Sequence, residues 1–283
     1  MIIKENYDLY QYNTMRLHSV ADVLYMPESR KELTYLISKL VAESKPYQVI
    51  SAGSNIILAE YVKTALINLM KVDDTIEFLG DSKVKVGCSV RVQKLIRELQ
   101  KHALGGVEYL FSVPTSIGGA IYMNAGRGKD IGLAISDYLE EVDYYSPSEN
   151  CIKTYKKSTG DFRYRMSPFQ GTDKIIVSAT FKFKEQPAEE TERLIKERME
   201  HSKKYLSADK PSCGTVFCEG NRLLYRLLMG KRCGDAMYSK KTPDWISNMG
   251  NATASDVMNL IEKGIKWHRW IGSKCRVEIK YIE

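Results

Sequence analysis

The sequence predicts a protein of mixed helices and strands, in the α+β class. Two segments, 29–45 and 92–103, carry apolar residues at helical spacing, whereas 82–90 and 174–184 alternate between apolar and polar residues as strands do. The connections between these segments are short, and no segment repeats. With 283 residues, 43% of them hydrophobic, the chain is long enough for two or three folding units.

The elements of the first half follow in order. Ser29 is a typical N-cap residue for the first helix. Residues 47–53 have the pattern of a buried strand that ends in small residues, and residues 54–60 begin another apolar run. Residues 140–147 and 150–157 are weaker strand patterns on either side of the turn SPSEN.

The composition changes in the second half. Residues 185–206 predict a charged helix that faces solvent, and residues 251–272 predict a late helix that begins near Thr253 or Ser255. Residues 275–283 predict a single closing strand. We therefore place the main domain boundary near residue 186.

The charge and hydropathy of the sequence indicate which kinds of ligand and which cellular compartment to expect. The formal charge of +7 comes from 42 basic and 35 acidic residues that are interleaved, which fits an anionic small molecule at least as well as nucleic acid. The N-terminal residues lack an apolar stretch of signal-peptide length, and no later run approaches the ~18 apolar residues of a membrane span. We expect a cytoplasmic, monomeric protein with no nucleic-acid or membrane partner.

Six cysteines are scattered along the chain without CxxC spacing. They predict reduced, structural thiols and no metal site, and the alternative is a disulfide or a metal centre. The six are Cys88, Cys151, Cys213, Cys218, Cys233 and Cys275.

The stretch SVPTSIGGAIYMNAG, residues 112–126, has no helical or strand period. Residues 118–120 are Gly-Gly-Ala, which lack the side chains that would hold a ligand away from the main chain. Successive backbone N–H groups together with the Thr115 and Ser116 hydroxyls would suit a pyrophosphate. The alternative is a tight turn between packed elements.

A second loop, residues 52–55, also follows an apolar run, and its backbone could face the same ligand. Asn55 and Asn124 add side-chain donors that could read the edge of a ring. Neither loop has the GxGxxG fingerprint that follows a strand, nor the GxxxxGK[ST] pattern, so neither standard nucleotide fold is indicated.

Seven motifs are spread along nearly the whole chain: YNTMRLHSVADVLYMP at 12–27, SAGSNIIL at 51–58, the long block at 90–126, FRYRMSPF at 162–169, PSCGTVF at 211–217, ISNMGNATASDV at 246–257 and VEIKYI at 277–282. In this order they resemble the UDP-N-acetylenolpyruvoylglucosamine reductases, the MurB family of flavoproteins in peptidoglycan synthesis.

The resemblance implies a two-part FAD-binding domain of the vanillyl-alcohol-oxidase (PCMH) type, over 1–72 and 73–185, and a C-terminal α/β substrate-binding domain over 186–283. It also implies the compact branch of the family, without the loop that carries an extra tyrosine. FAD is expected to be noncovalent, because SAGSN supplies neither His nor Cys for attachment. The implied cofactor-binding residues are Ser51, Ala52, Gly53, Ser54, Asn55, Pro114, Thr115, Ser116, Gly118, Gly119, Ala120, Asn124 and Gly126.

The family chemistry implies three catalytic residues. Reduced flavin gives hydride to an enolpyruvyl carbon, and a hydroxyl protonates the neighbouring carbon. Arg165 matches the arginine that stabilises the developing charge, with a surface salt bridge as the alternative. Glu278 matches the glutamate that polarises the enolate or orients a donor, with a solvent-facing strand charge as the alternative. Thr215 stands where the family has a serine proton donor, and its extra methyl group restricts the rotamer.

Departures from the family pattern concentrate in the half expected to bind the nucleotide sugar. The family segment SEKHANFIVN appears here as SKKTPDWISN, so that Thr242 replaces a histidine and Asp244 replaces an asparagine. An ionised Asp244 accepts hydrogen bonds only and would be a poor partner for a diphosphate. NRLLYRLLMGKRCG also departs from the family segment. The expected substrate-binding residues are Lys240, Lys241 and Arg226, with Arg232 as a further cation.

The resemblance therefore implies an enzyme that reduces UDP-N-acetylglucosamine-enolpyruvate to UDP-N-acetylmuramate with NADPH, a step of cell-wall biogenesis on which cell shape and cell division depend. One alternative is a related FAD oxidoreductase that acts on another substrate. The other is a flavin-binding module whose catalytic activity has been lost.

Overall fold

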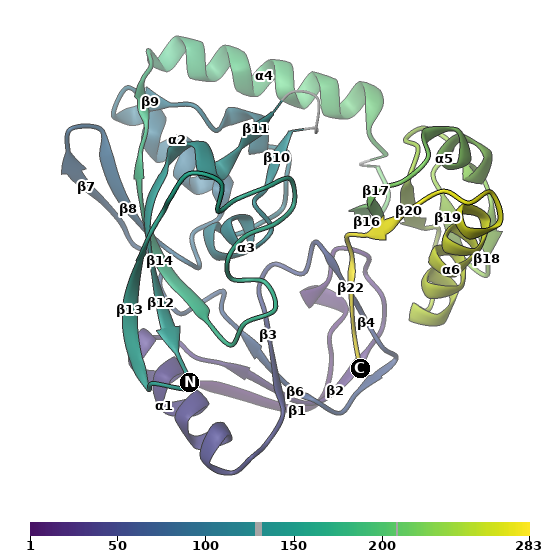
Figure 1. The fold of residues 1–283 in the computed structure, drawn as a ribbon, viewed down its shortest axis with the longest axis horizontal. Coiled ribbons are helices and arrows are strands. Elements are labelled where there is room, and N and C mark those ends of the chain that lie inside the picture. Colours follow the sequence, from purple (N-terminus) through teal and green to yellow (C-terminus); the bar gives the residue numbers. More distant parts are fainter. Residues whose placement is uncertain (128–131, 208) are drawn as a thin grey trace. The chain divides into compact units, whose positions relative to one another are not determined.

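The computed structural model describes residues 1–127, 132–207 and 209–283, which form two compact units (Figure 1). Unit 1 comprises Met1–Ile3, Leu24–Ala52 and Leu66–Met199. Unit 2 comprises Lys4–Val23, Gly53–Ala65 and Glu200–Glu283. The predicted division at residues 72 and 185 stays a prediction, because compactness does not tell which part binds which ligand.

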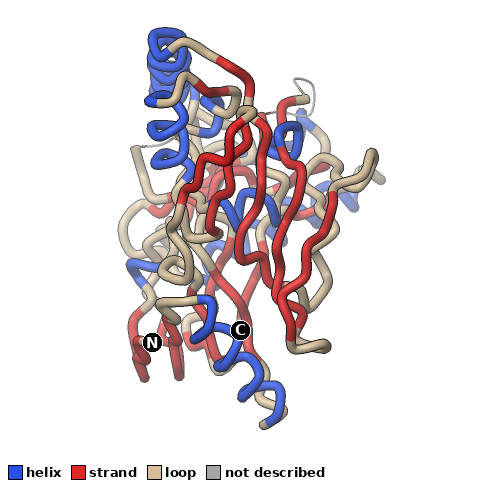
Figure 2. Tube along the Cα trace, turned by 90° about the vertical axis from the view of Figure 1, so that its left-hand side faces the viewer, coloured by secondary structure: helices blue, strands red, loops and turns tan. Residues whose placement is uncertain are grey.

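The centre of unit 1 is a five-stranded antiparallel sheet with the order β13-β12-β14-β8-β7. Figure 2 shows its strands side by side in red. The turn SPSEN joins β12 to β13 where Ser146 pairs with Cys151, as the sequence predicts. The strands are β7 (Ile76–Gly80), β8 (Lys83–Gly87), β12 (Leu139–Ser146), β13 (Cys151–Lys156) and β14 (Ile175–Lys182).

Two helices of unit 1 confirm the helical spacing of the sequence. Helix α1 (Arg30–Ala42) begins after Ser29, whose hydroxyl accepts a hydrogen bond from the Glu32 N–H, and the helix buries one apolar stripe. Helix α2 (Val92–Lys101) buries Val92, Leu95, Ile96 and Leu99, at the i, i+3 and i+4 spacing of a single face. Both stripes pack into the hydrophobic core that covers the central sheet.

The remaining elements of unit 1 are shorter, apart from one long helix that extends into unit 2. They are β3 (Tyr47–Ile50), β6 (Ala65–Asn68), β9 (Leu104–Gly105), β10 (Gly126–Arg127), β11 (Leu133–Ala134), β15 (Lys184–Glu185), α3 (Ile117–Tyr122), the long helix α4 (Ala188–Tyr205), and the 3₁₀ helices Glu108–Leu110 and Ile135–Tyr138. Helix α4 corresponds to the charged helix predicted at 185–206.

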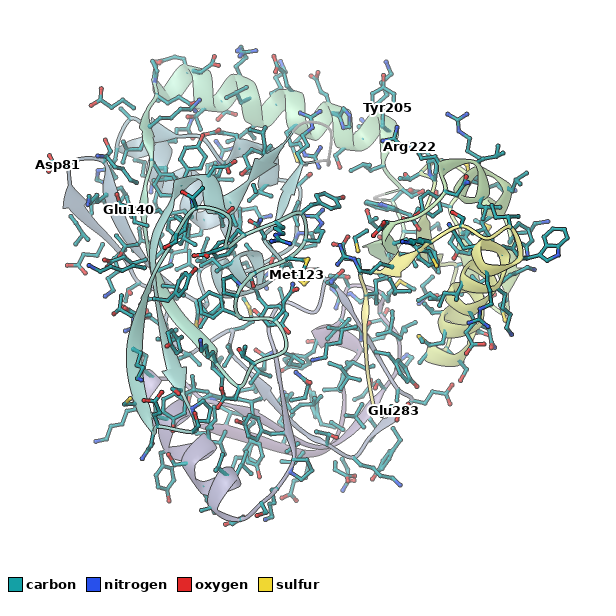
Figure 3. The ribbon with its side chains drawn as sticks, viewed as in Figure 1. Asp81, Met123, Glu140, Tyr205, Arg222 and Glu283 are labelled. Atoms are coloured by element: carbon teal, nitrogen blue, oxygen red, sulfur yellow. The ribbon has the colours of Figure 1, made fainter. Side chains whose placement is uncertain are left out.

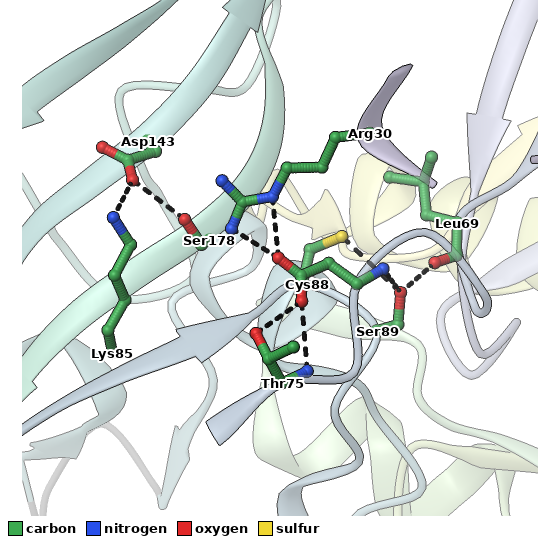
Figure 4. Close-up of polar contacts among 9 residues, drawn as sticks. Arg30, Leu69, Thr75, Lys85, Cys88, Ser89, Asp143 and Ser178 are labelled. Atoms are coloured by element: carbon green, nitrogen blue, oxygen red, sulfur yellow. Dashed lines mark hydrogen bonds and ion pairs between the residues drawn. The ribbon is translucent and has the colours of Figure 1, made fainter. Parts of the chain in front are cut away.

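A polar cluster joins the start of α1 to the end of β8 (Figure 4). The Arg30 guanidinium pairs with the buried Asp73 carboxylate, with Nε at 2.7 Å from Oδ2. The Thr75 hydroxyl donates to the other carboxylate oxygen at 2.6 Å, and the Asp73 N–H donates to the Ser89 hydroxyl at 2.9 Å. The Asp73 charge is therefore neutralised and hydrogen-bonded, as a buried charge must be.

Unit 2 holds a four-stranded sheet with the order β16-β20-β19-β18. Helices α5 and α6 contact each other, and α6 packs against β18 and β19. The late helix begins at Ala254, and its N-cap is Thr253, whose hydroxyl accepts a hydrogen bond from the Asp256 N–H in a capping box. The elements are β16 (Ser212–Thr215), β17 (Phe217–Glu219), α5 (Arg222–Leu228), β18 (Arg232–Cys233), β19 (Ala236–Tyr238), β20 (Trp245–Asn248), α6 (Ala254–Trp270), β4 (Ile56–Leu58), β5 (Tyr61–Val62) and the 3₁₀ helix Tyr10–Tyr12.

Two N-terminal strands, β1 (Ile2–Asp8) and β2 (Val20–Met26), each contain residues of both units. In unit 1, β2 pairs in parallel with β6 through Leu24 and Leu66. In unit 2, it pairs in parallel with β5 through Val20 and Tyr61.

The closing strand predicted at 275–283 is two short strands. Strand β21 (Arg276–Val277) pairs with β17 in antiparallel orientation, whereas β22 (Lys280–Ile282) pairs with β4 in parallel. The chain changes partners at Glu278 and Ile279, so a single continuous strand could not satisfy both pairings. This break lies at one of the predicted catalytic residues.

All six cysteines are free thiols, and the described residues hold no cluster of His, Cys, Asp and Glu with the geometry of a metal site. Among the described helices, none combines the length and the low charge that crossing a membrane requires.

Candidate functional site

In unit 1 the end of β3 meets the start of α3. The Ser51 and Ser116 hydroxyl oxygens lie 2.6 Å apart, and Ser116 caps α3 by accepting a hydrogen bond from the Gly119 N–H at 3.3 Å. The Asn68 side chain donates to the Ser51 carbonyl at 3.2 Å. Two loops that the sequence identified separately, about 65 residues apart, therefore form one cluster of hydroxyls together with Thr115.

The glycines of the 112–126 stretch have different roles from one another. A Cβ at Gly118 would lie 3.1 Å from the Cys88 Cβ, and a Cβ at Gly126 would lie 2.1 Å from the Leu133 carbonyl oxygen. These two glycines allow close packing of the chain on itself, and Ala120 is fully buried in the core. Of these residues, Gly119 faces the hydroxyl cluster, since its Cβ would lie 3.1 Å from the Thr115 hydroxyl oxygen.

The backbone N–H groups of residues 118–120 are paired inside the chain. The Gly118 N–H donates to the Cys88 carbonyl at 3.0 Å, and the Ala120 N–H donates to the Ser116 carbonyl at 2.8 Å. With the Gly119 N–H on the Ser116 hydroxyl, all three donors are already used inside the chain. The hydroxyls and the neighbouring loop are left as the groups that could contact a ligand here.

The loop at residues 52–54 has the donors that a pyrophosphate requires. Among the described residues, no acceptor is found for the N–H groups of Ala52, Gly53 and Ser54. Gly53 has a φ of +72°, and a Cβ there would lie 2.0 Å from the Tyr12 carbonyl oxygen, so only glycine fits. A run of consecutive unpaired N–H groups is a typical anion-binding arrangement, and it fits the diphosphate of FAD.

Asn55, the last residue of the SAGSN motif, has a structural contact in unit 2. Its side-chain amide donates to the Glu278 carbonyl oxygen at 3.0 Å. The Lys280 N–H donates to the Asn55 carbonyl at 3.1 Å, so Asn55 and the 278–280 segment hold each other on two sides. Asn55 therefore positions the backbone of Glu278.

Arg165 lies in a tight turn of unit 1 with a strained backbone. Arg163 and Met166 exchange backbone hydrogen bonds of 3.2 and 2.9 Å across Tyr164 and Arg165. Arg165 has a φ of +57°, in the left-handed region that residues other than glycine rarely adopt. Such strain persists only where surrounding contacts impose it, and it concentrates at functional sites.

Three side chains attach this turn to the end of α3. The Asn124 amide donates to the Arg163 carbonyl at 2.9 Å, and the Ser167 hydroxyl donates to the Tyr122 carbonyl at 2.7 Å. The Gln170 amide bridges the Tyr122 and Arg165 carbonyls, at 2.8 and 3.2 Å. Met123, labelled in Figure 3, directly follows α3 in this region. Residues at the end of the 112–126 stretch therefore help to hold the turn that carries Arg165.

Sequence reasoning missed Gln170, although it directly follows the FRYRMSPF motif. It also treated the Asn124 side chain as a donor to the edge of a ligand ring. The Asn124 amide nitrogen is used by Arg163, but its Oδ1 is buried and accepts no hydrogen bond within the described residues. This orphaned acceptor leaves Asn124 able to accept a hydrogen bond from a bound ring, and buried polar atoms of this kind call for a partner.

In unit 2, Thr215 lies at the end of β16 and pairs with Trp245 in β20. The Trp245 indole N–H donates to the Thr215 hydroxyl oxygen at 3.3 Å. An indole can only donate, so Thr215 accepts in this contact and keeps its own proton for another group. The backbone of Glu278 lies close to this residue, because the Glu278 N–H donates to the carbonyl of Val216, the residue after Thr215, at 2.8 Å.

Asp244 also hydrogen-bonds to the segment that follows Thr215. Its carbonyl accepts a hydrogen bond from the Val216 N–H at 2.9 Å, and its Oδ2 accepts one from the Phe217 N–H at 3.0 Å. Burial raises the pKa of the Asp244 carboxyl to about 8, against the Phe217 hydrogen bond, which lowers it, and the nearby Glu278 charge adds to the rise.

The predicted substrate-binding cations differ in their surroundings. Lys240, Arg226 and Arg232 are exposed, as is Pro114 of the cofactor set. The Lys241 ammonium donates to the Lys203 carbonyl at 2.6 Å in the last turn of α4, so Lys241 has a capping contact as well as a charge.

Thr242, which replaces the family histidine, belongs to a buried hydroxyl network. Its hydroxyl accepts a hydrogen bond from the Ser207 N–H at 2.8 Å and donates to the Tyr205 carbonyl at 3.0 Å. The Ser207 and Ser239 hydroxyl oxygens lie 2.5 Å apart beside it. Thr242 therefore fastens the end of α4 to the segment before β20.

The structure brings the predicted residues together in two groups. Ser51, Thr115, Ser116 and Gly119 meet in unit 1, which also carries Arg165, whereas Thr215, Glu278 and Asn55 meet in unit 2. The meeting of Arg165 with Thr215 and Glu278 stays a prediction.

Comparison with known proteins agrees with these arrangements. A family model described as an FAD binding domain matches residues 21–155. The UDP-N-acetylenolpyruvoylglucosamine reductase of Lactobacillus gasseri is 30% identical over 93% of this chain and 89% of its own length. The enzyme of the same name from Lactobacillus delbrueckii subsp. bulgaricus is 30% identical over 98% of this chain and 95% of its own.

The structural likeness covers the whole chain. The crystal structure of UDP-N-acetylenolpyruvylglucosamine reductase (MurB) from Thermus caldophilus matches with a TM-score of 0.80 and 28% identity, covering 100% of both chains. The predicted fold class, a mixed fold with an FAD-binding domain of the vanillyl-alcohol-oxidase type, is confirmed.

Proposed function

Because the chain belongs to the UDP-N-acetylenolpyruvoylglucosamine reductase family of FAD-binding oxidoreductases, we propose that it reduces UDP-N-acetylglucosamine-enolpyruvate to UDP-N-acetylmuramate with NADPH. This reaction would place the protein in the synthesis of peptidoglycan precursors. FAD would be held without a covalent bond, because the SAGSN loop contains no His or Cys.

The residues present fit FAD. The unpaired N–H groups of Ala52, Gly53 and Ser54 would receive its diphosphate, and the buried Oδ1 of Asn124 would accept from its ring. When bound, FAD would carry hydride from NADPH to the substrate.

The observation that carries the proposal is the hydrogen bond from the Trp245 indole to the Thr215 hydroxyl oxygen. Reduction of the enolpyruvyl double bond adds one hydride and one proton to adjacent carbons. Because Thr215 accepts from Trp245, its O–H bond is directed elsewhere and can supply the proton. Thr215 would then recover a proton from solvent. Its β-methyl restricts χ1, which the Trp245 contact restricts further.

Two charged residues would complete the chemistry. Arg165, whose backbone lies in the strained turn, would stabilise the charge that develops toward the substrate carboxylate with its guanidinium fork. Glu278, held by Asn55 and Val216, would act on the enolate from the β21–β22 break. The exposed cations Lys240 and Arg226 would face the diphosphate of the nucleotide sugar.

A different nucleotide sugar is the second candidate substrate. In the altered segment SKKTPDWISN, the Lys241 ammonium, the Thr242 hydroxyl and the Asp244 carboxylate oxygen Oδ2 all make internal contacts. Because these side chains are engaged inside the protein, fewer side chains of this segment can contact the sugar than in the family pattern.

The experiment uses the purified protein with its bound flavin, photoreduced under anaerobic conditions. UDP-N-acetylglucosamine-enolpyruvate should reoxidise the flavin within a catalytic time, whereas UDP-N-acetylglucosamine, which lacks the double bond, should not. Reduction by NADPH but no reoxidation by this substrate would reject the proposal in favour of another acceptor. A flavin that NADPH does not reduce either would indicate a binding module without catalysis.

A further inference from the structure

Asp244 and Glu278 both hydrogen-bond to the backbone of one residue, Val216. The Val216 N–H donates to the Asp244 carbonyl at 2.9 Å, and the Val216 carbonyl accepts from the Glu278 N–H at 2.8 Å. Val216 directly follows Thr215 in the chain, and Trp245, which contacts the Thr215 hydroxyl, directly follows Asp244. The proposed proton donor therefore begins a short strip of chain, Thr215–Phe217, whose backbone is hydrogen-bonded by two acidic residues.

The backbone of Asp244 directs its side chain onto this strip. Its φ of +64° is left-handed, a conformation that Asp and Asn tolerate better than most residues. With that backbone, the carbonyl reaches Val216 and Oδ2 reaches the Phe217 N–H at 3.0 Å. One residue thus binds two consecutive N–H groups directly after Thr215.

The second carboxylate oxygen of Asp244 has no such partner. Oδ1 is buried and makes no hydrogen bond within the described residues, and Asp244 has no ion pair there. Oδ1 is therefore the oxygen that can carry a proton, while Oδ2 continues to accept from Phe217. A buried, unpaired carboxyl in these surroundings favours its neutral form.

The titratable groups that face Asp244 come from three elements. Cys213 is on β16, Tyr238 is on β19, and Glu278 lies at the β21–β22 break. Burial raises the pKa of Cys213 to about 12 and raises the pKa of Tyr238, so both are neutral at physiological pH. The charge beside Asp244 is thus that of Glu278, which repels a second negative charge.

We infer that Asp244 is a positioning residue that makes the proposed proton transfer sensitive to pH. As a neutral carboxyl it holds the Thr215–Phe217 strip beside Glu278 without adding charge. As a carboxylate it places a second negative charge next to Glu278, in the region where an anionic substrate must bind and receive a proton. The inference rests on the proposed function. An asparagine, which the family pattern has here, would hold the same contacts at every pH.

The first measurement is the pH dependence of the two half-reactions, by stopped flow, in wild type and Asp244→Asn. In the wild type, flavin reoxidation by UDP-N-acetylglucosamine-enolpyruvate should fall by about tenfold per pH unit above pH ~8, which matches the raised pKa of Asp244. Asp244→Asn should remove this alkaline decline, because Asn is neutral and still accepts from Phe217. Reduction by NADPH should depend on pH identically in both proteins.

Glu262→Gln is the matched control, since Glu262 is an exposed acid of α6 whose partner is Lys266. It should keep the wild-type profile. An alkaline decline that persists unchanged in Asp244→Asn overturns the inference, and so does an equal loss of rate at all pH values, which would indicate a structural role alone.

Infrared spectroscopy tests the Asp244 proton without substrate. A carbonyl band of a protonated carboxyl should be present in wild type near pH 6.5, should fade above pH ~8, and should be absent in Asp244→Asn. A wild-type spectrum without this band overturns the inference even if the variant does not fold. If the band is present but the enolpyruvyl substrate never reoxidises the flavin, the proposed function fails while the protonation of Asp244 stands.

Discussion

The Trp245 indole N–H donates to the Thr215 hydroxyl oxygen at 3.3 Å, across the pairing of β20 with β16. This contact orients the hydroxyl without consuming its proton, because an indole nitrogen cannot accept. The contact joins Thr215, which the sequence analysis predicted as a proton donor, to Trp245, which it did not predict as a site residue.

We expect Thr215→Ala to slow flavin reoxidation by the enolpyruvyl substrate by about 10²- to 10⁴-fold, the usual contribution of a positioned proton donor. Thr215→Ser keeps the hydroxyl with a freer χ1 and should retain or raise the rate. Reduction by NADPH should be unchanged in both. The two half-reactions must be measured separately by stopped flow, and equal oxidative rates for wild type and the Ala variant would remove Thr215 from the mechanism.

Gln170→Ala should loosen the turn that carries Arg165, because the Gln170 amide supports both the Arg165 and the Tyr122 carbonyls. A small misplacement of a catalytic group costs about 10- to 100-fold in rate, so the oxidative half-reaction should fall by that order. FAD content should stay at the wild-type level. Gln11→Ala, at an exposed glutamine, is the control. Loss of FAD with no change in rate per flavin would assign Gln170 to cofactor binding instead.

Gly53→Ala should destabilise the protein by about 3 kcal/mol or more, since its Cβ would lie 2.0 Å from the Tyr12 carbonyl oxygen at a φ of +72°. Gly171→Ala separates the two causes. Gly171 has a φ of +73° with nothing within 4 Å, so it should lose only the ~1 kcal/mol of backbone strain. Urea denaturation with matched m-values measures both, and similar losses in the two variants would mean that the Tyr12 contact relaxes.

The Asp244 carboxyl should contribute a loss of stability as the pH rises from about 4 to about 8. The Asp244 carboxyl titrates near 4 in the unfolded chain and near 8 in the folded one, so the folded state binds more protons between these values. Raising the pH therefore favours unfolding, by up to about 1.4 kcal/mol per pH unit from this group. Asp244→Asn should remove that slope in urea titrations across the range. A variant with the wild-type slope would show that other groups produce it.

Local patterns in the sequence predicted the elements well. Ser29 and Thr253 cap helices because a hydroxyl next to an apolar stripe can satisfy a free N–H within the same turn. The alternation at 82–90 and 174–184 became β8 and β14, although Ile175 to Ala179 of β14 are buried on both faces of the strand. The order of motifs along the chain also indicated the family, which the relatives confirm.

Contacts between distant segments could not be predicted in this way. The single strand expected at 275–283 divides at Glu278, because its two halves find different partners in β17 and β4. The sequence did not predict that the missing side chains of Gly118 and Gly126 leave space for Cys88 and Leu133. Steric fit of this kind depends on which segments of the chain meet. The periodicity of the sequence does not contain that information.

The sequence by itself therefore determined the family and most of the helices and strands, because these depend on residue type and short spacing. The tertiary structure alone decided what surrounds each side chain. It brought Asp244 and Glu278 to the backbone of Val216 and directed Gln170 to the Arg165 carbonyl. Burial and these long-range hydrogen bonds determine whether an acidic side chain carries a proton, and whether a side chain positions another residue or itself reacts. Both arise only when separate segments of the chain fold together.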